Sequence, residues 1–321
     1  MKANLEISAL KSYNLGGRYL AFGLLIDSPI PLPEASPAGR DTPADVTVTL
    51  GEPGGGLPDD SSFIKAREKR TWWFGMPGAT CMIFNCPSGL YVIKNGNEIF
   101  ISLYPDADME LAKIYLLGSA MGAIQVQRGR IPVHGGVVST PRGAMIITGG
   151  QGVGKSTMTS AFVHNGYSYL SDDVSSVSIE NGHARVFPAY PQRKLIRDAC
   201  APLGYVPDDL ILVDEKRDKF AVRDRDNWQS EPADLWAIIE LYPVEGGRVT
   251  VSPVTGHKKL AGVTRNLYRM WMHLPGGEMK PEVFKKVLTI ASQAEEYRVE
   301  VPRDIENIAG IAGDISAALG I

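Results

Sequence analysis

The sequence has few cysteines, little net charge and no long hydrophobic run, and each absence excludes a class of protein. Only three of its 321 residues are cysteines, without metal-site spacing or a CxxC pair, so a disulfide framework is not expected. A net charge of -3 gives no footprint for nucleic acid or an anionic membrane. No apolar run approaches bilayer length, and residues 1–17 lack the apolar core of a signal sequence. We therefore expect a cytoplasmic protein that binds neither nucleic acid nor membrane.

The first third of the chain has the pattern of a β-rich domain. Between Tyr19 and Leu103, short apolar stretches are separated by segments rich in Pro, Gly and Asp. Two of these stretches, at 91–94 and 98–101, flank Asn95-Gly96-Asn97, which tolerates positive φ and predicts a hairpin.

The pattern changes at Asp106. Apolar residues from Met109 to Val126 follow helical spacing, with Asp106 or Asp108 as the cap and Gly129 near the end. We therefore predict a smaller β-rich domain over residues 1–105 and a second domain over 106–321.

The second domain alternates strands with helices, which predicts an α/β fold with a mixed sheet. Asn181-Gly182 and Gly246-Gly247 indicate antiparallel hairpins within it. The expected strands are 133–138, 144–148 and 167–170, the expected hairpins 177–187 and 237–253, and the expected helices 155–164, 256–272, 281–297 and 304–319.

The segment GGQGVGKST has the spacing of a P-loop, between an expected strand and an expected helix. Glycines let successive backbone amides curl around phosphate oxygens, and the helix N-terminus adds a positive dipole end. Lys155 is placed to hold the β- and γ-phosphates, and the Ser156 hydroxyl to bind Mg²⁺. The predicted nucleotide-binding residues are Gly149, Gly150, Gln151, Gly152, Val153, Gly154, Lys155, Ser156 and Thr157.

Two adjacent carboxylates, Asp172 and Asp173, follow the expected strand 167–170. One can bind Mg²⁺ while the other accepts a proton, because neighbouring carboxylates near a dication acquire different proton affinities. The sequence does not assign their order, and a solvated capping turn is the simpler alternative.

His134 lies before the P-loop strand, where a hairpin would bring it near the nucleotide. A hydrogen-bonded core histidine is an equally good interpretation. Among the many basic residues, Arg193, Lys194 and Lys219 are the candidates for contact with phosphate or substrate, against the alternative of a solvated charged face.

The segment from Val133 to Val174 resembles the catalytic core of HPr kinase/phosphorylase. The resemblance is carried by His134, the P-loop, the His164-Asn165-Gly166 helix exit and the Asp172-Asp173 pair. It implies a phosphoenolpyruvate carboxykinase-like P-loop fold in which the histidine and both aspartates surround the transferring phosphate, with ATP and Mg²⁺ as cofactors.

Looser cues across the chain resemble a narrower branch, the HPr-kinase-related proteins of lasso-peptide gene clusters. They include YLAFGL with IPLP near the N-terminus, RGRIPVH before the core, PAYP with KL after it, and LWAII further on. The branch implies phosphorylation of the C-terminal serine of a precursor peptide. Thr157 stands where HPr kinases usually have glutamate, and the glycine-rich phosphorylase segment is not found, so reverse phosphorolysis is not predicted.

The resulting hypothesis is a cytoplasmic serine kinase that uses ATP and Mg²⁺ and acts on a ribosomal precursor peptide. Its catalytic residues would be Asp172, Asp173, His134 and Lys155, and its metal-binding residues Ser156 with the two aspartates. The alternatives are a kinase of a carrier protein or small molecule, and a nucleotide-gated peptide-binding protein without chemistry. Homo-oligomerisation, the nucleotide donor and the number of phosphates added stay open.

Overall fold

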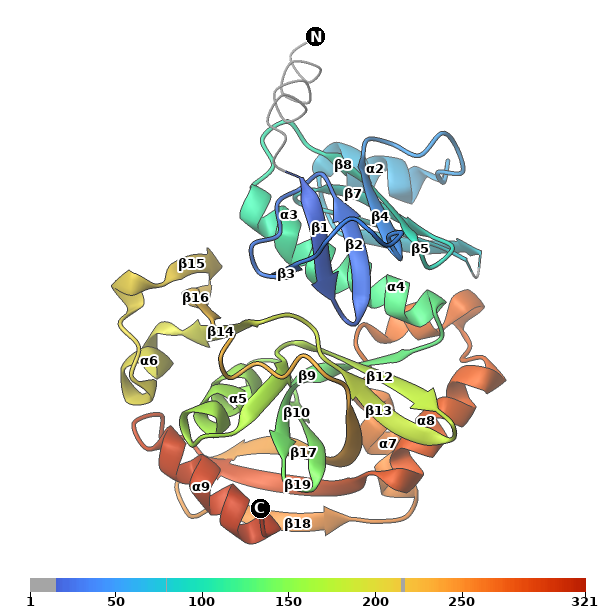
Figure 1. Ribbon diagram of the computed structural model, residues 1–321. Coiled ribbons are helices and arrows are strands. Elements are labelled where there is room, and N and C mark those ends of the chain that lie inside the picture. The colour runs from blue at the N-terminus through green and yellow to red at the C-terminus, as the bar shows by residue number, and fades with distance from the viewer. Residues whose placement is uncertain (1–15, 79, 215–216) are drawn as a thin grey trace. The chain divides into compact units, whose positions relative to one another are not determined.

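The computed structural model describes residues 16–78, 80–214 and 217–321, which form two compact units (Figure 1). The first unit holds the described residues up to Arg128 together with Trp271–Glu278, and the second holds Gly129–Met270 and Met279–Ile321. Most of the N-terminal segment judged to lack a signal sequence lies outside the described residues. Within the described ranges, no helix combines the length and the apolar character needed to cross a membrane.

The first unit is built on an eight-stranded sheet in the order β3-β1-β2-β4-β8-β7-β6-β5. The predicted hairpin is confirmed, because β7 and β8 pair antiparallel and the turn residues Asn95 and Gly96 take φ values of 57° and 70°. The strands are β1 Gly17–Ala21, β2 Leu24–Ser28, β3 Ser36–Pro37, β4 Val46–Leu50, β5 Trp73–Gly78, β6 Cys81–Cys86, β7 Gly89–Lys94 and β8 Glu98–Leu103.

Helices cover both faces of this sheet at β7, because successive side chains of a strand point to opposite faces. Leu90 and Val92 pack with Phe63 of α2 (Ser61–Lys69). Tyr91, on the other face, donates a hydrogen bond to the carbonyl of Ala112 in α3 (Met109–Tyr115) at 3.1 Å. A π-helical turn (Leu116–Ala120) joins α3 to α4 (Met121–Gln127).

The helix predicted after Asp106 is confirmed, and Asp108 caps it by accepting hydrogen bonds from the amides of Glu110 and Leu111. The sequence-based boundary between residues 105 and 106 differs from the observed division, which places this helix in the first unit. The reason is its packing on the first sheet, where the Gln127 amide also donates to the carbonyl of Ile93 at 3.0 Å.

The second unit has the predicted α/β architecture with a mixed sheet. Its strand order is β10-β9-β12-β13-β17-β19-β18, and β10 also pairs with β17, which closes part of the sheet on itself. The strands are β9 Ile131–Thr140, β10 Gly143–Gly149, β11 Ser168–Ser171, β12 Val174–Glu180, β13 His183–Phe187, β17 Ala233–Val244, β18 Thr250–Val254 and β19 Glu295–Pro302.

Strand β10 is buried on both faces, so it lies between two hydrophobic cores. Met145 and Ile147 belong to the core that includes residues of α5 (Lys155–His164) and α9 (Ile308–Leu319). Ala144 and Ile146 belong to the core with residues of α7 (His257–Arg265) and α8 (Pro281–Gln293). Helices thus cover both faces of the strand that leads into the P-loop (Figure 1).

Two sequence predictions, the helix over 281–297 and the hairpin over 237–253, are wrong because both overlooked the strand β19 (Glu295–Pro302). The helix predicted over 281–297 ends at Gln293, and β19 follows at once. This strand then inserts between β17 and β18, pairing parallel with the first and antiparallel with the second. The hairpin predicted over 237–253 therefore does not form, although Gly246 and Gly247 do take positive φ.

The other predicted strands, the hairpin over 177–187 and the helix after the P-loop are confirmed. The helix predicted over 256–272 ends at Arg265, and that predicted over 304–319 begins at Ile308. Among the described residues, the unpredicted elements include the helix α2 of the first unit and the helix α6 Arg197–Cys200. They also include a three-stranded sheet in the order β14-β16-β15, with β14 Gln192–Ile196, β15 Ile211–Asp214 and β16 Lys219–Arg223. The 3-10 turns Ala201–Leu203, Pro207–Asp209, Met270–His273 and Pro275–Gly277 were not predicted either.

Candidate functional site

The P-loop connects the C-terminal end of β10 to the N-terminus of α5. Its residues Gly149, Gly152 and Gly154 take φ values of 140°, 79° and 95°, which L side chains rarely adopt. A Cβ on Gly149 would also approach the carbonyl of Leu241 to 2.9 Å. Gly154 caps α5 without a side-chain hydrogen bond, so the amides of the first turn have no intrahelical partner. This arrangement is suited to binding an anion.

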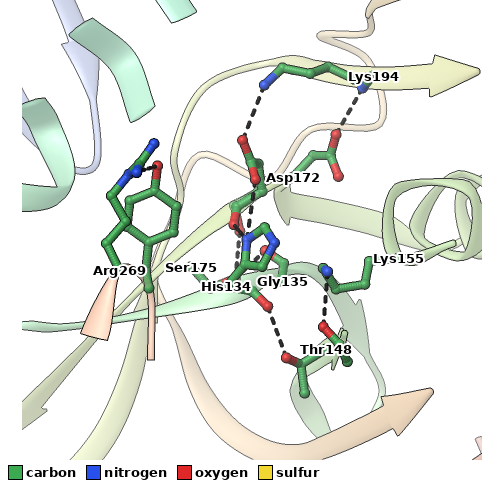
Figure 2. A network of polar contacts seen from close by, with 12 residues as sticks. His134, Gly135, Thr148, Lys155, Asp172, Ser175, Lys194 and Arg269 are labelled. Carbon is green, nitrogen blue, oxygen red and sulfur yellow. Dashed lines mark hydrogen bonds and ion pairs between the residues drawn. The ribbon is translucent and has the colours of Figure 1, made fainter. Parts of the chain in front are cut away.

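Lys155, the first residue of α5, folds back into this loop. Its ammonium group donates hydrogen bonds to the carbonyls of Gly149 and Gly150 at 3.0 and 2.9 Å, and the residue is only 9% exposed (Figure 2). Burial lowers the pKa of Lys155, while the charges of Asp173 and Asp172 oppose that change. The ammonium group is therefore within electrostatic reach of both predicted aspartates.

Asp172 follows the last residue of β11 and is buried. One carboxylate oxygen, Oδ2, accepts a hydrogen bond from the backbone amide of Lys194 at 2.8 Å. The other, Oδ1, is buried, and no described residue gives it a hydrogen bond. Burial raises the pKa of this carboxyl, although Lys194 and the nearby Ser156 hydroxyl act to lower it. Asp172 thus keeps one oxygen available for a cation or a proton.

Asp173 takes a φ of 89°, an unusual conformation for a residue other than glycine. Its backbone carbonyl accepts a hydrogen bond from the amide of Gly135 at 3.1 Å, which holds the turn against β9. Its carboxylate forms an ion pair with Lys194 at 3.2 Å, and its oxygen Oδ1 lies 3.3 Å from Nδ1 of His134. Burial alone would raise the pKa of Asp173, but these two partners hold it well below its usual range. Asp173 is therefore ionised at neutral pH.

His134 lies on β9, opposite Val174 of β12. Its Nδ1 is 3.1 Å from the carbonyl oxygen of Asp173 and 3.3 Å from the carboxylate oxygen Oδ1 of the same residue. Both neighbours are hydrogen-bond acceptors, so Nδ1 carries the hydrogen and Nε2 is left as the second site of the ring. The half-exposed side chain favours the site interpretation of His134 over that of a core histidine.

Lys194, on β14, contacts both aspartates through different groups. Its backbone amide holds Asp172 and its ammonium group holds Asp173 (Figure 2). Burial would lower the pKa of Lys194, but Asp173 raises it, so the ammonium group stays charged. Lys194 therefore fixes the two carboxylates relative to each other.

The other two basic candidates differ. Arg193 is fully buried and points away from Lys194, because neighbours in a strand face opposite sides. It forms an ion pair with Asp224 at 2.8 Å and a cation–π contact with Tyr169, which assigns it a structural role. Lys219, on β16, lies near enough to Lys155 to lower the pKa of that residue.

Sequence reasoning missed Tyr268 and Arg269. The Tyr268 ring centroid is 5.9 Å from that of His134, and its hydroxyl oxygen is 3.4 Å from Nε of Arg269. Figure 2 shows Arg269 in the same view as His134 and Asp172. Both residues fall in the part of the predicted helix 256–272 that is not helical, and Arg269 takes a φ of 44°. No local signal in the sequence marks them.

The donor set fits Mg²⁺ shared with phosphate. Within the part of the chain that the structure describes, no group of three His, Cys, Asp or Glu side chains could hold a metal by itself. Mg²⁺, however, typically uses one or two carboxylates together with phosphate oxygens and water. Asp172, with its unpartnered oxygen beside Ser156, supplies such a carboxylate.

Comparisons with protein-family models and with curated proteins found no match. Among solved structures, the chain is similar to the Hpr(Ser) kinase/phosphatase from Coxiella burnetii, over 59% of this chain and 99% of that one. The sequence identity is 11% and the TM-score is 0.32. Values this low do not establish a shared fold.

Proposed function

We propose that the chain is a kinase that uses ATP and Mg²⁺ to phosphorylate a serine hydroxyl. The observation that carries this proposal is the cluster of Asp172 and Asp173 with Lys194 and His134 beside the P-loop. His134 is tied to the strand that leads into the loop, because its carbonyl accepts a hydrogen bond from the Thr148 hydroxyl at 2.9 Å. A protein that only binds nucleotide needs the loop and a metal ligand. It does not need a second ionised aspartate held by a lysine and a histidine.

The geometry supports a different role for each aspartate. Asp172 lies beside Ser156, so these two residues would hold Mg²⁺, which neutralises charge on the phosphate oxygens when bound. Asp173 is ionised and about a third exposed, so it would accept a hydrogen bond from the incoming hydroxyl. A weakly basic carboxylate suffices, because phosphoryl transfer with a loose transition state depends more on positioning than on proton removal.

Lys155 would exchange its two loop carbonyls for phosphate oxygens. His134 and Lys194 would keep the Asp173 carboxylate in place, and Nε2 of His134 would donate to, or accept from, the transferring group according to its protonation. The phosphoenolpyruvate carboxykinase-like classification of this core stays a prediction.

We infer that the acceptor is the C-terminal serine of a ribosomal precursor peptide of the lasso type, which the β-rich first unit helps to hold. The support is the set of sequence cues spread across both units, from YLAFGL to LWAII. A carrier protein or a small molecule would use the same phosphate chemistry, so the acceptor must be tested directly.

The test is intact-mass spectrometry of a panel of acceptors incubated with enzyme, ATP and Mg²⁺. The panel holds lasso-type precursor peptides ending in serine, the same peptides ending in alanine, and HPr. We expect a phosphoryl mass gain only on the serine-ending peptides, and loss of that gain in Lys155→Ala. Lys285→Ala, which changes an exposed lysine of α8, is the matched control.

Each outcome decides between the candidates. Gain on HPr alone would assign a carrier-protein kinase. No gain on any acceptor, with ATP bound normally, would contradict the peptide kinase and favour a nucleotide-gated binding protein. Transfer at the wild-type rate in Lys155→Ala would contradict the mechanism itself.

A further inference from the structure

A second helix of the second unit begins in a way that leaves positive charge unbalanced. Helix α7 is capped by Gly256, with a φ of 61° and no side-chain hydrogen bond to its first turn. That first turn holds His257, Lys258 and Lys259, and it has no acidic residue. Basic side chains at the positive end of a helix dipole are unfavourable unless an anion lies nearby.

A cavity of about 380 Å³ lies beside this helix terminus. It is lined by the segments 253–256 and 295–297 together with Lys259. The segment 295–297 starts β19, and Glu295 pairs with Ala237, itself opposite Met145 near the start of β10. The P-loop follows the other end of β10, so the cavity and the P-loop lie at opposite ends of the sheet.

The lining of the cavity also includes an acidic residue, Glu296. Glu296 is only 4% exposed, and its buried oxygen Oε2 has no hydrogen-bond partner among the residues that the structure describes. Its side chain packs so closely on α7 that a Cβ on Gly262 would lie 1.8 Å from Oε1. Two neighbouring donors, Arg265 and Asn266, are already used, because both bind Glu240.

The adjacent residue Glu295 differs from Glu296, because its carboxylate has hydrogen-bond donors. Its carboxylate accepts hydrogen bonds from Arg142 at 2.9 Å and from the Tyr297 hydroxyl at 2.6 Å. Among the described residues no donor reaches Oε2 of Glu296, and burial together with the charge of Glu240 raises the pKa of Glu296 to about 7, although the charges of Arg265 and Lys259 act to lower it. A buried carboxyl that lacks a donor is costly, so a ligand that supplies one would bind favourably.

We propose that this cavity binds a small zwitterion of the amino-acid type, with its carboxylate at the N-terminus of α7 and its ammonium group at Glu296. The backbone amides of the first turn and Lys259 would hold the carboxylate. Pro253, Val254 and Tyr297 line the rest of the cavity, so an apolar side chain is favoured. The site does not depend on the proposed kinase activity.

Isothermal titration calorimetry with three matched probes tests this proposal. The probes are L-leucine, 4-methylpentanoate, which lacks the ammonium group, and 3-methylbutylamine, which lacks the carboxylate. Thermal-shift measurements with each of the common amino acids, at concentrations up to about 10 mM, cover other side chains. We expect a zwitterion to bind and both single-ended probes to bind at least about tenfold more weakly.

Variants locate the site. Glu296→Gln keeps the shape but removes the charge, and we expect it to weaken zwitterion binding by about tenfold or more. Lys259→Ala should weaken binding several-fold, whereas Lys258→Ala, in the same turn but outside the lining, should leave it unchanged. ATP binding should be unaffected in all three variants, which separates this site from the P-loop.

Two results would overturn the proposal. One is that no amino acid binds to the wild-type protein over the whole concentration range. The other is that a zwitterion binds to Glu296→Gln as tightly as to the wild type, since binding would then lie elsewhere. Unchanged thermal unfolding of the ligand-free variants, or a rise for Glu296→Gln, confirms that each one is folded.

Discussion

Helices α5 and α7 start from the same local design at the two ends of one sheet. Each begins at a glycine with positive φ, lacks a side-chain cap, has lysine in its first turn and faces a buried carboxylate with an unpartnered oxygen. The carboxylates differ in their neighbours. Asp172 accepts a hydrogen bond from the amide of Lys194, whereas among the described residues no donor reaches Oε2 of Glu296, which lies near the negatively charged Glu240. The proposed kinase therefore depends on charges that already contact one another, and the proposed zwitterion site depends on a carboxylate that a ligand would complete.

The largest effect is expected at the P-loop end, from replacing either aspartate. Asp173→Asn removes the acceptor for the hydroxyl and should lower kcat by about 10²–10⁴-fold with ATP affinity kept. Asp172→Asn should instead raise the Mg²⁺ concentration required for half-maximal activity. Steady-state kinetics across a Mg²⁺ series separates the two. A near-normal kcat in Asp173→Asn would remove the distinction between the aspartates.

The next effect concerns Lys194, which holds Asp173 through its side chain and Asp172 through its backbone. Lys194→Met should lower kcat by about 10–100-fold, as loss of a positioning partner does. The backbone contact with Asp172 would survive, so the dependence on Mg²⁺ should change less than in Asp172→Asn, although the charge of Lys194 also acts on Asp172. In an Asp173→Asn background the further loss should vanish, because the partner is already gone. An additive loss in the double variant would indicate a separate role for Lys194.

The P-loop end was predictable from sequence because its signals are local. Glycine spacing marks the loop, and the Asp172-Asp173 pair directly follows a predicted strand. The residues that contact the two aspartates come from distant parts of the sequence. His134 reaches Asp173 because β9 pairs with β12. Lys194 lies in a three-stranded sheet that the sequence did not indicate. The alternation of side chains along a strand predicts that Arg193 and Lys194 face opposite sides, but it does not predict which of them contacts the aspartates.

The arrangement at the start of α7 was not predictable from the sequence, because strand β19 brings Glu296 next to this helix. Helix-favouring residues at 281–293 extended the predicted helix into Glu295–Tyr297, which hid the start of this strand. The alternation of Val299 and Val301 was the available signal. Once β19 is placed between β17 and β18, Glu296 and the start of α7 line the same cavity.

A smaller effect is expected on the free energy of unfolding when Glu296, with its unpartnered oxygen, is replaced. Its folded-state pKa of about 7 exceeds the reference value of 4.5, so the folded protein keeps this proton to higher pH. The contribution of Glu296 to the free energy of unfolding is therefore lost as the pH rises from about 4.5 to about 7. Glu296→Gln should be more stable than the wild type by about 1–3 kcal/mol near pH 8, and equally stable below about pH 4. Urea unfolding of both proteins across this range measures the difference.

Glu295→Gln is the control for this measurement. Hydrogen bonds from Tyr297 and Arg142 hold the pKa of Glu295 below its usual range, although burial acts against them. Its replacement should therefore destabilise the protein above the carboxyl titration, with the opposite sign from Glu296→Gln. If both substitutions changed stability in the same direction, the contrast between a partnered and an unpartnered carboxylate would be wrong.

The smallest effect compares the two helix caps directly. A Cβ on Gly154 or on Gly256 would meet nothing within 4 Å, so substitution by alanine introduces backbone strain without a clash. Each variant should lose about 1–2 kcal/mol of unfolding free energy, measured by urea denaturation. Only Gly154→Ala should also weaken ATP binding in calorimetry, because its loop must present its amides to phosphate. Weaker ATP binding in Gly256→Ala would mean that the two ends of the sheet are coupled.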